Sequence, residues 1–362
     1  MLVTAIEAHP LRSLDRLRVE LEPGIVSVVG PNGVGKTNLV EALYFALTGR
    51  SFRTSDRRDL IPFGGSLARA EATIRDADGL ERRLLASVSR SEGRRHLLDG
   101  GPADPATIAR NRPPVAVFAP DRLSLVKGPP AERRAHLDGF LAARWPYRAE
   151  LRKRFGQALA QRNALLARLA AGYGSPDDLD IWDAGLAVAA APVVEARAEA
   201  VAELAVPFAA AAAELGLEDA VLEYAPRAAG TEEEIRAGLA ERREQEIRLG
   251  RTNWGPHLDE LKLEMGGRSL RKYGSQGQQR TALLALLFAE REVLLAARLV
   301  TPLLLLDDVM SELDPGRRDR LVARLAAGGQ ALITAADEES VPAAALASVV
   351  RMPSSQVGSA AA

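Results

Sequence analysis

One eight-residue segment, residues 30–37 (GPNGVGKT), constrains the fold of this 362-residue chain more than any other. It follows the β-branched run at residues 24–29 and precedes a stretch in which Leu39, Leu43 and Leu47 recur at helical spacing. In such a strand, loop and helix, the pattern G-x-x-x-x-G-K-[ST] directs backbone N–H groups at phosphate oxygens. A glycine turn that only caps the helix is the alternative. The sequence therefore predicts a phosphate-binding loop in an α/β domain.

The residue types in this segment suit a nucleoside triphosphate bound with magnesium. Lys36 is positioned to neutralise the β- and γ-phosphates, and the Thr37 hydroxyl is a magnesium ligand. The predicted nucleotide-binding residues of the loop and helix start are Gly30, Asn32, Gly33, Val34, Gly35, Lys36, Thr37 and Asn38. We expect ATP and Mg²⁺ as cofactors.

Two adjacent carboxylates end the most apolar run, residues 302–308 (PLLLLDD). A continuous apolar run of this length is typical of a buried parallel strand. We assign Asp307 to the metal and Asp308 to the attacking water, because a carboxylate at a strand end can hold magnesium while its neighbour orients or deprotonates water. Turn or helix-capping aspartates are the alternative.

Two further segments carry a resemblance to ABC-type ATPase heads. Residues 307–314 (DDVMSELD) resemble the Walker B motif and D-loop. Residues 275–279 (SQGQQ), at the start of a helix expected at 276–299, resemble the signature motif. The resemblance implies that the signature of one subunit caps the γ-phosphate held by the other, in a homodimer. It implies signature roles for Ser275, Gln276, Gly277 and Gln278, a D-loop role for Asp314, and catalytic roles for Lys36, Ser275 and Asp308. A simple helix cap at Ser275 remains open.

The order and spacing of other segments resemble the RecF family of recombination mediators. They are residues 30–39, 41–42, 49–54 (GRSFRT), 118–123 (FAPDRL), 126–129, 133–134 and 255–259 (GPHLD). The resemblance implies a weak DNA-stimulated ATPase that closes on duplex or gapped DNA, acting with RecO and RecR to promote RecA loading at single-stranded gaps. Residues 11–13 (LRS) resemble the element through which related heads contact nucleotide. The resemblance implies that Arg12 contacts nucleotide, and a surface arginine is the alternative.

Four positions depart from the family patterns. Transporter ATPases place a magnesium-sensing Gln near residue 120, where this chain has no Gln and Asp121 is the candidate replacement. Their switch His would follow Ile333, where this chain has Thr334. Asp308 replaces the usual catalytic Glu with a shorter side chain, so slow hydrolysis is expected. His257 precedes Leu258 rather than Arg, and a packed or capping His is the alternative to a functional one.

The pattern of apolar residues divides the chain into three parts and a tail. We expect the fold class α/β, an ABC-type P-loop ATPase head with a mixed sheet flanked by helices and an inserted α-helical arm. The head covers 1–125 and 251–352, the arm 126–250, and a disordered tail 353–362. Strand signals disappear in the arm, and Pro192 and Pro207 are predicted to interrupt its helices.

Charge composition gives no global attraction to DNA, because 47 basic and 48 acidic residues leave a net charge of −1. Any polyanion must therefore bind a local patch. The candidate DNA-binding residues are Arg50, Arg53, Arg57, Arg58, Arg94 and Arg95. A solvated arginine-rich face is the alternative reading of these clusters.

Composition also excludes several classes of protein. The absence of Cys excludes disulfides, thiolate zinc sites and iron–sulfur ligation, and four scattered His argue against a His-based metal site. No apolar run approaches the roughly 20 residues of a membrane-spanning helix, so we expect a cytoplasmic protein with no membrane partner. A transporter-type ATPase subunit coupled to a membrane or other protein partner, and a small-molecule P-loop kinase, are the alternatives.

Overall fold

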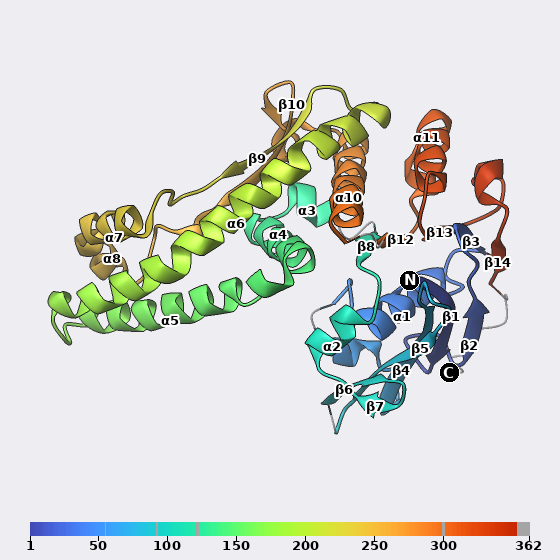
Figure 1. Cartoon of the computed structure of the whole chain (residues 1–362), viewed down its shortest axis with the longest axis horizontal. Helices are drawn as coiled ribbons and strands as arrows, with labels where there is room; N and C mark the ends of the chain where they lie inside the picture. Colours follow the sequence, from blue (N-terminus) through green and yellow to red (C-terminus); the bar gives the residue numbers. More distant parts are fainter. Residues whose placement is uncertain (55, 92, 120–122, 299–300, 353–362) are drawn as a thin grey trace. The chain divides into compact units, whose positions relative to one another are not determined.

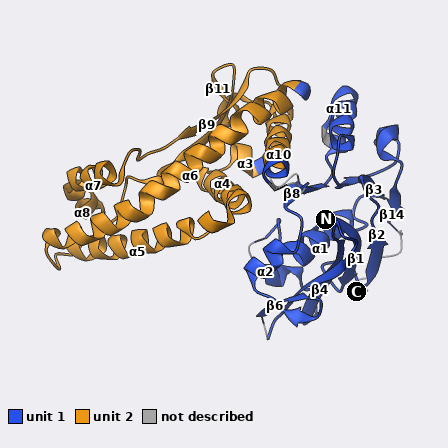
Figure 2. Ribbon diagram, in the orientation of Figure 1, with its two compact units in different colours: residues 1–123, 214–216, 294–362 blue, residues 124–213, 217–293 orange. Residues whose placement is uncertain are grey.

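The chain forms two compact units in the computed structural model, which describes residues 1–54, 56–91, 93–119, 123–298 and 301–352 (Figure 2). The head unit comprises Met1–Leu123, Glu214–Gly216 and Leu294–Ala362, and the helical unit comprises Ser124–Ala213 and Leu217–Val293. The expected boundary at residue 250 therefore does not coincide with a boundary between compact units, because residues 251–293 pack with the helical unit. The expected tail lies outside the described residues.

Two separate sheets form the head unit (Figure 1). A six-stranded antiparallel sheet has the order β2-β1-β4-β5-β6-β7, and a five-stranded parallel sheet has the order β14-β3-β13-β12-β8. The strands are β1 Leu2–His9, β2 Leu17–Glu20, β3 Ile25–Val29, β4 Leu67–Arg75, β5 Glu81–Ser89, β6 Gly93–Leu98, β7 Gly101–Pro102, β8 Val115–Phe118, β12 Leu303–Leu306, β13 Ala331–Ala335 and β14 Val349–Arg351. The helices are α1 Lys36–Thr48, α2 Pro105–Arg110 and α11 Pro315–Ala326, with short 3-10 helices η1 Arg57–Leu60, η6 Met310–Glu312 and η7 Ala343–Ala345. The α/β class is confirmed, with the antiparallel and parallel strands in different sheets.

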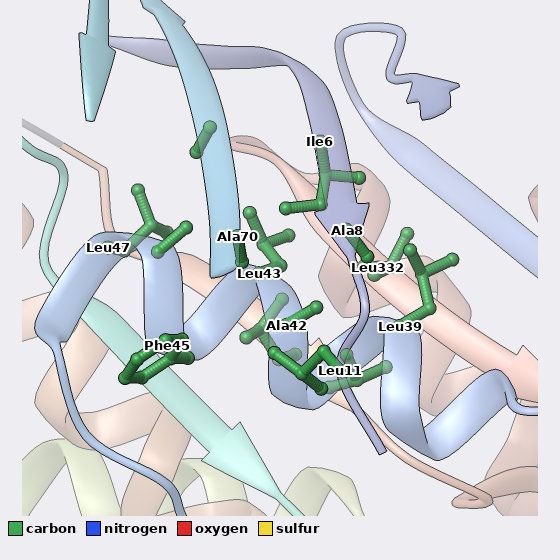
Figure 3. Packing of buried hydrophobic residues seen from close by; sticks show 14 of the residues in the cluster. Ile6, Ala8, Leu11, Leu39, Ala42, Leu43, Phe45, Leu47, Ala70 and Leu332 are labelled. Atoms are coloured by element: carbon green, nitrogen blue, oxygen red, sulfur yellow. The ribbon is translucent and has the colours of Figure 1, made fainter. Parts of the chain in front are cut away.

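Helix α1 lies between these sheets and organises the head core. Leu39 and Leu43 are fully buried in one cluster with Ile6 and Ala70 of the antiparallel sheet and Leu332 of the parallel sheet (Figure 3). Burying a leucine side chain is worth about 2 kcal/mol, so this cluster fixes α1 and the loop that enters it.

The register of the parallel sheet sets where its strands end. Every residue of β3 and β12 is buried, as expected for strands covered on both faces. Leu306 pairs with Ile333 and with Phe118, and Val29 pairs with Ala335. The residues that follow or end β3, β12 and β13 therefore meet at one edge of the sheet.

The helical unit is built mainly from long helices. Its elements are α3 Ser124–Lys127, α4 Pro130–Arg144, η3 Pro146–Arg148, α5 Leu151–Ala170, η4 Pro176–Asp178, α6 Leu179–Glu214, β9 Ala220–Ala225, α7 Glu232–Glu241, α8 Arg243–Leu249, η5 Pro256–Leu258, β10 Glu260–Met265, β11 Arg268–Ser269, α9 Leu270–Tyr273 and α10 Gln276–Arg298, of which the last residues of α6 and α10 belong to the head unit. The predicted interruptions at Pro192 and Pro207 are wrong, because α6 continues through both. Each proline removes one helical hydrogen bond, but buried neighbours such as Val193 and Phe208 hold the helix in place.

A strand inside the expected helical arm is a second correction. β9 pairs antiparallel with β10 and places Leu222 opposite Leu263. Ala220 and Leu222 are buried while Val221 and Glu223 are exposed, which is the two-residue period of a half-buried strand. In an alanine-rich background this short alternation gives little signal in the sequence.

Buried ion pairs join the elements of the helical unit. Arg162 of α5 is fully buried and bonds Asp183 of α6 at 2.7 Å and Glu246 of α8 at 2.5 Å. Arg197 of α6 bonds both oxygens of Asp138, at 2.9 and 3.1 Å. Hydrogen-bonded pairs of this kind offset the cost of removing charges from water.

Asp259, in the segment 255–259, is part of the same network. Its carboxylate accepts hydrogen bonds from Arg197 at 2.9 Å, from the Tyr224 hydroxyl and from the Arg227 amide at 2.8 Å. Burial is the main cause that raises the pKa of Asp259, and the Tyr224 hydrogen bond acts in the opposite direction. Asp259 therefore serves to join α6, β9 and β10.

Candidate nucleotide-binding site

The loop between β3 and α1 has the backbone shape of a phosphate cradle. Gly33 has φ 84° and Gly35, which precedes the first helical residue, has φ 105°, conformations that L side chains rarely adopt. A Cβ at Gly35 would also lie 2.9 Å from Leu14 Cδ2. The first amides of α1 have no partner within the helix, so they are available to an anion.

Lys36 is buried at the centre of this loop. Its Nζ donates to the carbonyl oxygens of Gly30, at 2.5 Å, and Pro31, at 3.0 Å. Burial lowers the pKa of Lys36, whereas the negative charges of Asp308 and Asp307 act to raise it. The ammonium group thus lies where phosphate oxygens could replace carbonyl oxygens as its partners.

Asp307, directly after β12, lies against the loop. Its Oδ1 accepts hydrogen bonds from Thr37 Oγ1 at 3.1 Å and from Thr334 Oγ1 at 2.8 Å. Burial raises the pKa of Asp307, while the hydrogen bonds from Thr334 and Thr37 act to lower it. Two predicted metal ligands that lie 270 positions apart in the sequence are therefore in contact.

The donor set at this point fits magnesium. A threonine hydroxyl and a carboxylate in contact are hard oxygen ligands, and magnesium bound with a nucleotide needs few protein ligands because phosphates and water complete its shell. Thr37 and Asp307 are the residues that would hold it. Among the described residues no group of three or more His, Cys, Asp or Glu is arranged to hold a metal ion by protein ligands alone.

Asp308, which follows the candidate metal ligand Asp307, has a constrained backbone. Its φ is 51°, in the left-handed region, and its amide donates to Thr334 Oγ1 at 2.8 Å. Such a conformation costs a non-glycine residue of order 1–3 kcal/mol, although Asp tolerates it better than most. Thr334 thus fixes both carboxylate residues, one through its side chain and the other through its backbone.

Arg12 is tied to the start of α1 by a buried carboxylate. Its guanidinium bonds both oxygens of Glu41, at 2.9 and 3.0 Å, and Glu41 is 0% exposed. Arg53 also reaches Glu41, at 3.5 Å, and donates to Asn38 Oδ1 at 3.2 Å. Asn38 Nδ2 donates in turn to Ser13 Oγ at 2.7 Å. The structure therefore places Arg53, predicted as a DNA-binding residue, in the hydrogen-bond network next to the loop.

The signature segment begins α10 in the helical unit. Ser275 and Gln278 form a reciprocal capping box, with Gln278 N donating to Ser275 Oγ at 3.2 Å and Ser275 N donating to Gln278 Oε1 at 2.8 Å. Ser275 and Gln276 are exposed, and Gly277 is half-buried. Ser275 thus caps α10. An exposed helix start of this kind binds an anion only in combination with other groups.

Other predicted positions have defined local roles. Asp314 caps α11, accepting a hydrogen bond from Arg317 N at 3.0 Å. His257 Nε2 lies 3.2 Å from Thr252 O, its ring stacks on Phe155, and burial lowers its pKa. His257 is therefore a packed residue of the helical unit. Asp121 lies outside the described residues.

Two residues that bear on the site were missed from the sequence. The sequence shows Thr334 only as a departure from a switch His, but its position near the end of a buried parallel strand next to β12 is a usable signal. Glu41 was noted only as part of a motif, and a charged residue on the apolar face of α1 could have indicated a buried ion pair.

Comparisons with known proteins cover almost the whole chain. Residues 2–359 match the family described as RecF/RecN/SMC N terminal domain. A DNA replication and repair protein RecF of Streptomyces avermitilis is 39% identical, over 94% of this chain and 95% of that protein. The RecF protein of Heliobacterium modesticaldum is 36% identical, over 90% of this chain and 89% of that protein.

Solved structures agree with these matches. A structure of the recombination mediator protein RecF with ATP has a TM-score of 0.84 at 27% identity, covering 94% of this chain and 93% of that one. A Pyrococcus furiosus Smc head domain has a TM-score of 0.57 at 17% identity, covering 97% and 94%, which supports the fold alone. Within the described residues, no helix is both long and apolar enough to span a membrane. The chain has the fold of an ABC-type ATPase head, and it belongs to the RecF family of the RecF/RecN/SMC proteins.

Proposed function

We propose that this protein is a DNA replication and repair ATPase that uses ATP binding to close a homodimer on duplex or gapped DNA. The observation that carries the proposal is the contact of Thr37 with Asp307 beside the buried Lys36. Relatives that match along nearly their whole length are named as DNA replication and repair proteins, and similar structures contain ATP.

ATP with Mg²⁺ is the proposed ligand of the loop. The amides at the start of α1 and the Lys36 ammonium bind the phosphates. Asn38, bonded to Ser13, and Arg12, bonded to Glu41, lie next to this loop. Magnesium held by Thr37 and Asp307 would neutralise charge that develops on the phosphate oxygens. Glu41 holds Arg12 in one orientation, which reduces the entropy lost on binding.

A second subunit is proposed to complete the site. Ser275 and the exposed start of α10 would supply N–H donors to the γ-phosphate bound by the partner subunit, and Asp314 would lie at the same interface. Closure would exclude water from the phosphates and bring the DNA-binding surfaces of two heads together. Action with RecO and RecR to promote RecA loading is part of this proposal.

Asp308 is proposed to orient the attacking water. Its backbone is fixed by Thr334, but its side chain is one methylene shorter than glutamate, so hydrolysis is expected to be slow and to serve as a switch that reopens the dimer. Asp308→Asn should retain ATP-dependent dimerisation while phosphate release falls by on the order of 100-fold. Equal turnover by the variant and the natural protein would remove Asp308 from this role.

A weak ATPase that responds to DNA tests the proposal as a whole. Phosphate release measured with and without a gapped duplex should rise when DNA is present. A phosphorylated small-molecule product in place of free phosphate, or turnover that depends on membranes and ignores DNA, would contradict the proposal.

A further inference from the structure

Away from the phosphate loop, two arginines of the head unit lie at the carboxyl end of α1, and the charge of a third acts on one of them. Arg50 follows the Gly49 cap of the helix, and Arg57 begins η1. Arg94 belongs to β6, and a Cβ at Gly49 would lie 3.3 Å from its Nη1. The Arg94 guanidinium therefore lies directly against the helix end. We call these three residues the arginine triad.

Arg57 and Arg50 are close enough to Arg94 to act on its charge. Burial lowers the pKa of Arg94, and the positive charges of Arg57 and then Arg50 lower it further. No carboxylate contributes to this shift. The negative end of the α1 dipole offsets part of the repulsion, since Arg94 lies at the last turn.

Every carboxylate between residues 38 and 60 already has another partner. Glu41 bonds Arg12 and Arg53, Asp56 bonds Arg58, and Asp59 accepts from Thr54 Oγ1 at 2.5 Å. Within the part of the chain that the structure describes, Arg50, Arg57 and Arg94 make no ion pair. The repulsion within the triad is thus left without an internal counter-charge.

The other three predicted DNA-binding arginines are placed differently. Arg53 is bonded to Glu41 and Asn38, and both oxygens of Asp56 accept hydrogen bonds from Arg58. Arg95 is adjacent to Arg94 on β6, and because successive side chains of a strand point to opposite faces, it lies on the face away from α1. The six candidates therefore separate into a triad and three residues with other surroundings.

We infer that Arg50, Arg57 and Arg94 together form the phosphate-binding surface through which the head unit contacts the backbone of duplex DNA. Guanidinium groups bind phosphate oxygens with charge-assisted hydrogen bonds, and three of them on separate elements suit a repeating polyanion better than one small anion. This inference rests on the proposed function, because it names the surface that the closed dimer would use. Base-specific contacts are not required.

Salt-dependent DNA binding distinguishes the triad from arginines that are already paired. The full chain with ATP and Mg²⁺ is titrated onto a fluorescently labelled duplex at several NaCl concentrations. The test variant is Arg50→Gln/Arg57→Gln/Arg94→Gln. The matched control, Arg18→Gln/Arg58→Gln/Arg75→Gln, removes the same charge from three exposed arginines that are bonded to carboxylates.

The test variant should reduce the slope of log K against log salt by about 2–3 and weaken binding at about 0.15 M salt by on the order of 100-fold, while the control changes little. A third variant, with lysine at all three triad positions, should keep most of the slope because it keeps the charge. Melting temperatures measured in parallel identify a variant that has lost its fold. If the glutamine variant is unfolded, the salt dependence of DNA binding by the lysine variant decides whether the charges of the triad bind DNA.

A test variant that binds DNA as well as the control overturns the inference and leaves the proposed function in place. The triad would then serve another anionic partner, such as an acidic protein segment. If the natural protein itself fails to bind duplex DNA with ATP, the proposed function fails, and the inference fails with it.

Discussion

Buried charges of the helical unit have different partners from those of the phosphate loop and the end of β12 in the head unit. In the helical unit, Arg162 and Arg197 bond to carboxylates. In the head unit, the buried Lys36 bonds to backbone carbonyls and Asp307 to two hydroxyls. Within the described residues, neither Lys36 nor Asp307 makes an ion pair.

The difference separates structural charges from charges available to a ligand. An ion pair that is removed from water needs a matched partner, and where it has one it joins helices. A buried charge with only neutral partners keeps most of its electrostatic potential for a ligand of opposite sign. Burial alone would not have distinguished Arg162 from Lys36, whereas the identity of their partners does.

The largest expected effect comes from removing the charge of the phosphate loop. Lys36→Met should reduce ATP turnover at least about 1,000-fold and abolish ATP-dependent dimerisation, because the phosphates lose their buried cation. The free energy of unfolding should stay equal or rise, since a charge without an ionic partner leaves the interior. Phosphate release, sedimentation and urea unfolding measure the three effects.

The control for this variant is Lys262→Met, which removes an exposed lysine bonded to Glu223 in the helical unit. It should leave turnover and dimerisation as they are in the natural protein. Normal ATP-dependent dimerisation of Lys36→Met would show that the loop charge is not the site of nucleotide binding.

Breaking a helical-unit network should have the reverse effects. Arg162→Met leaves Asp183 and Glu246 buried without their shared cation, which should lower the free energy of unfolding by about 3–5 kcal/mol. ATP binding by the folded variant should persist, because both carboxylates belong to the helical unit. Urea unfolding and binding of a fluorescent ATP analogue give the two readouts.

Arg168→Met on the same helix is its control, since Arg168 is exposed, and it should change stability by less than about 0.5 kcal/mol. The comparison between units breaks down if Arg162→Met is as stable as this control.

The smallest effect is expected at Thr334. Thr334→Val preserves shape but removes the hydrogen bond to Asp307 and the acceptor for the Asp308 amide, which should cost about 1–3 kcal/mol and slow turnover several-fold. Ser27→Ala, which loses a buried hydrogen bond to Ala345 O of η7, should cost stability without slowing turnover. Equal turnover for both variants would exclude a role for Thr334 in placing the carboxylates.

The elements that could be predicted from the sequence are those whose local pattern is typical of a single kind of structure. The loop at residues 30–37, the apolar strand before Asp307 and the long helix after Ser275 occur as expected. The continuous α6 and the strand β9 were not predicted, because a proline is tolerated in a well-packed helix and because alanine gives little periodic signal. In both cases tertiary packing decided the local structure.

Part of the candidate site could also be predicted, through residues that follow strands. The contact between Thr37 and Asp307 follows from parallel strands ending at one edge of a sheet. The grouping of Arg12 and Arg53 around Glu41 could not, because those residues come from separate segments and their side-chain partners depend on long-range packing. For the same reason, the separation of the six arginines into the arginine triad and three residues with other surroundings required the structure.

The central claim is that ATP closes a homodimer that holds DNA. Sedimentation of the full chain without nucleotide, with ADP and with ATP, each with and without a gapped duplex, tests it most directly. We predict a monomer that forms dimers only with ATP and that carries the duplex with it most strongly in that state. A monomer that is insensitive to nucleotide and leaves the DNA unbound would contradict the claim.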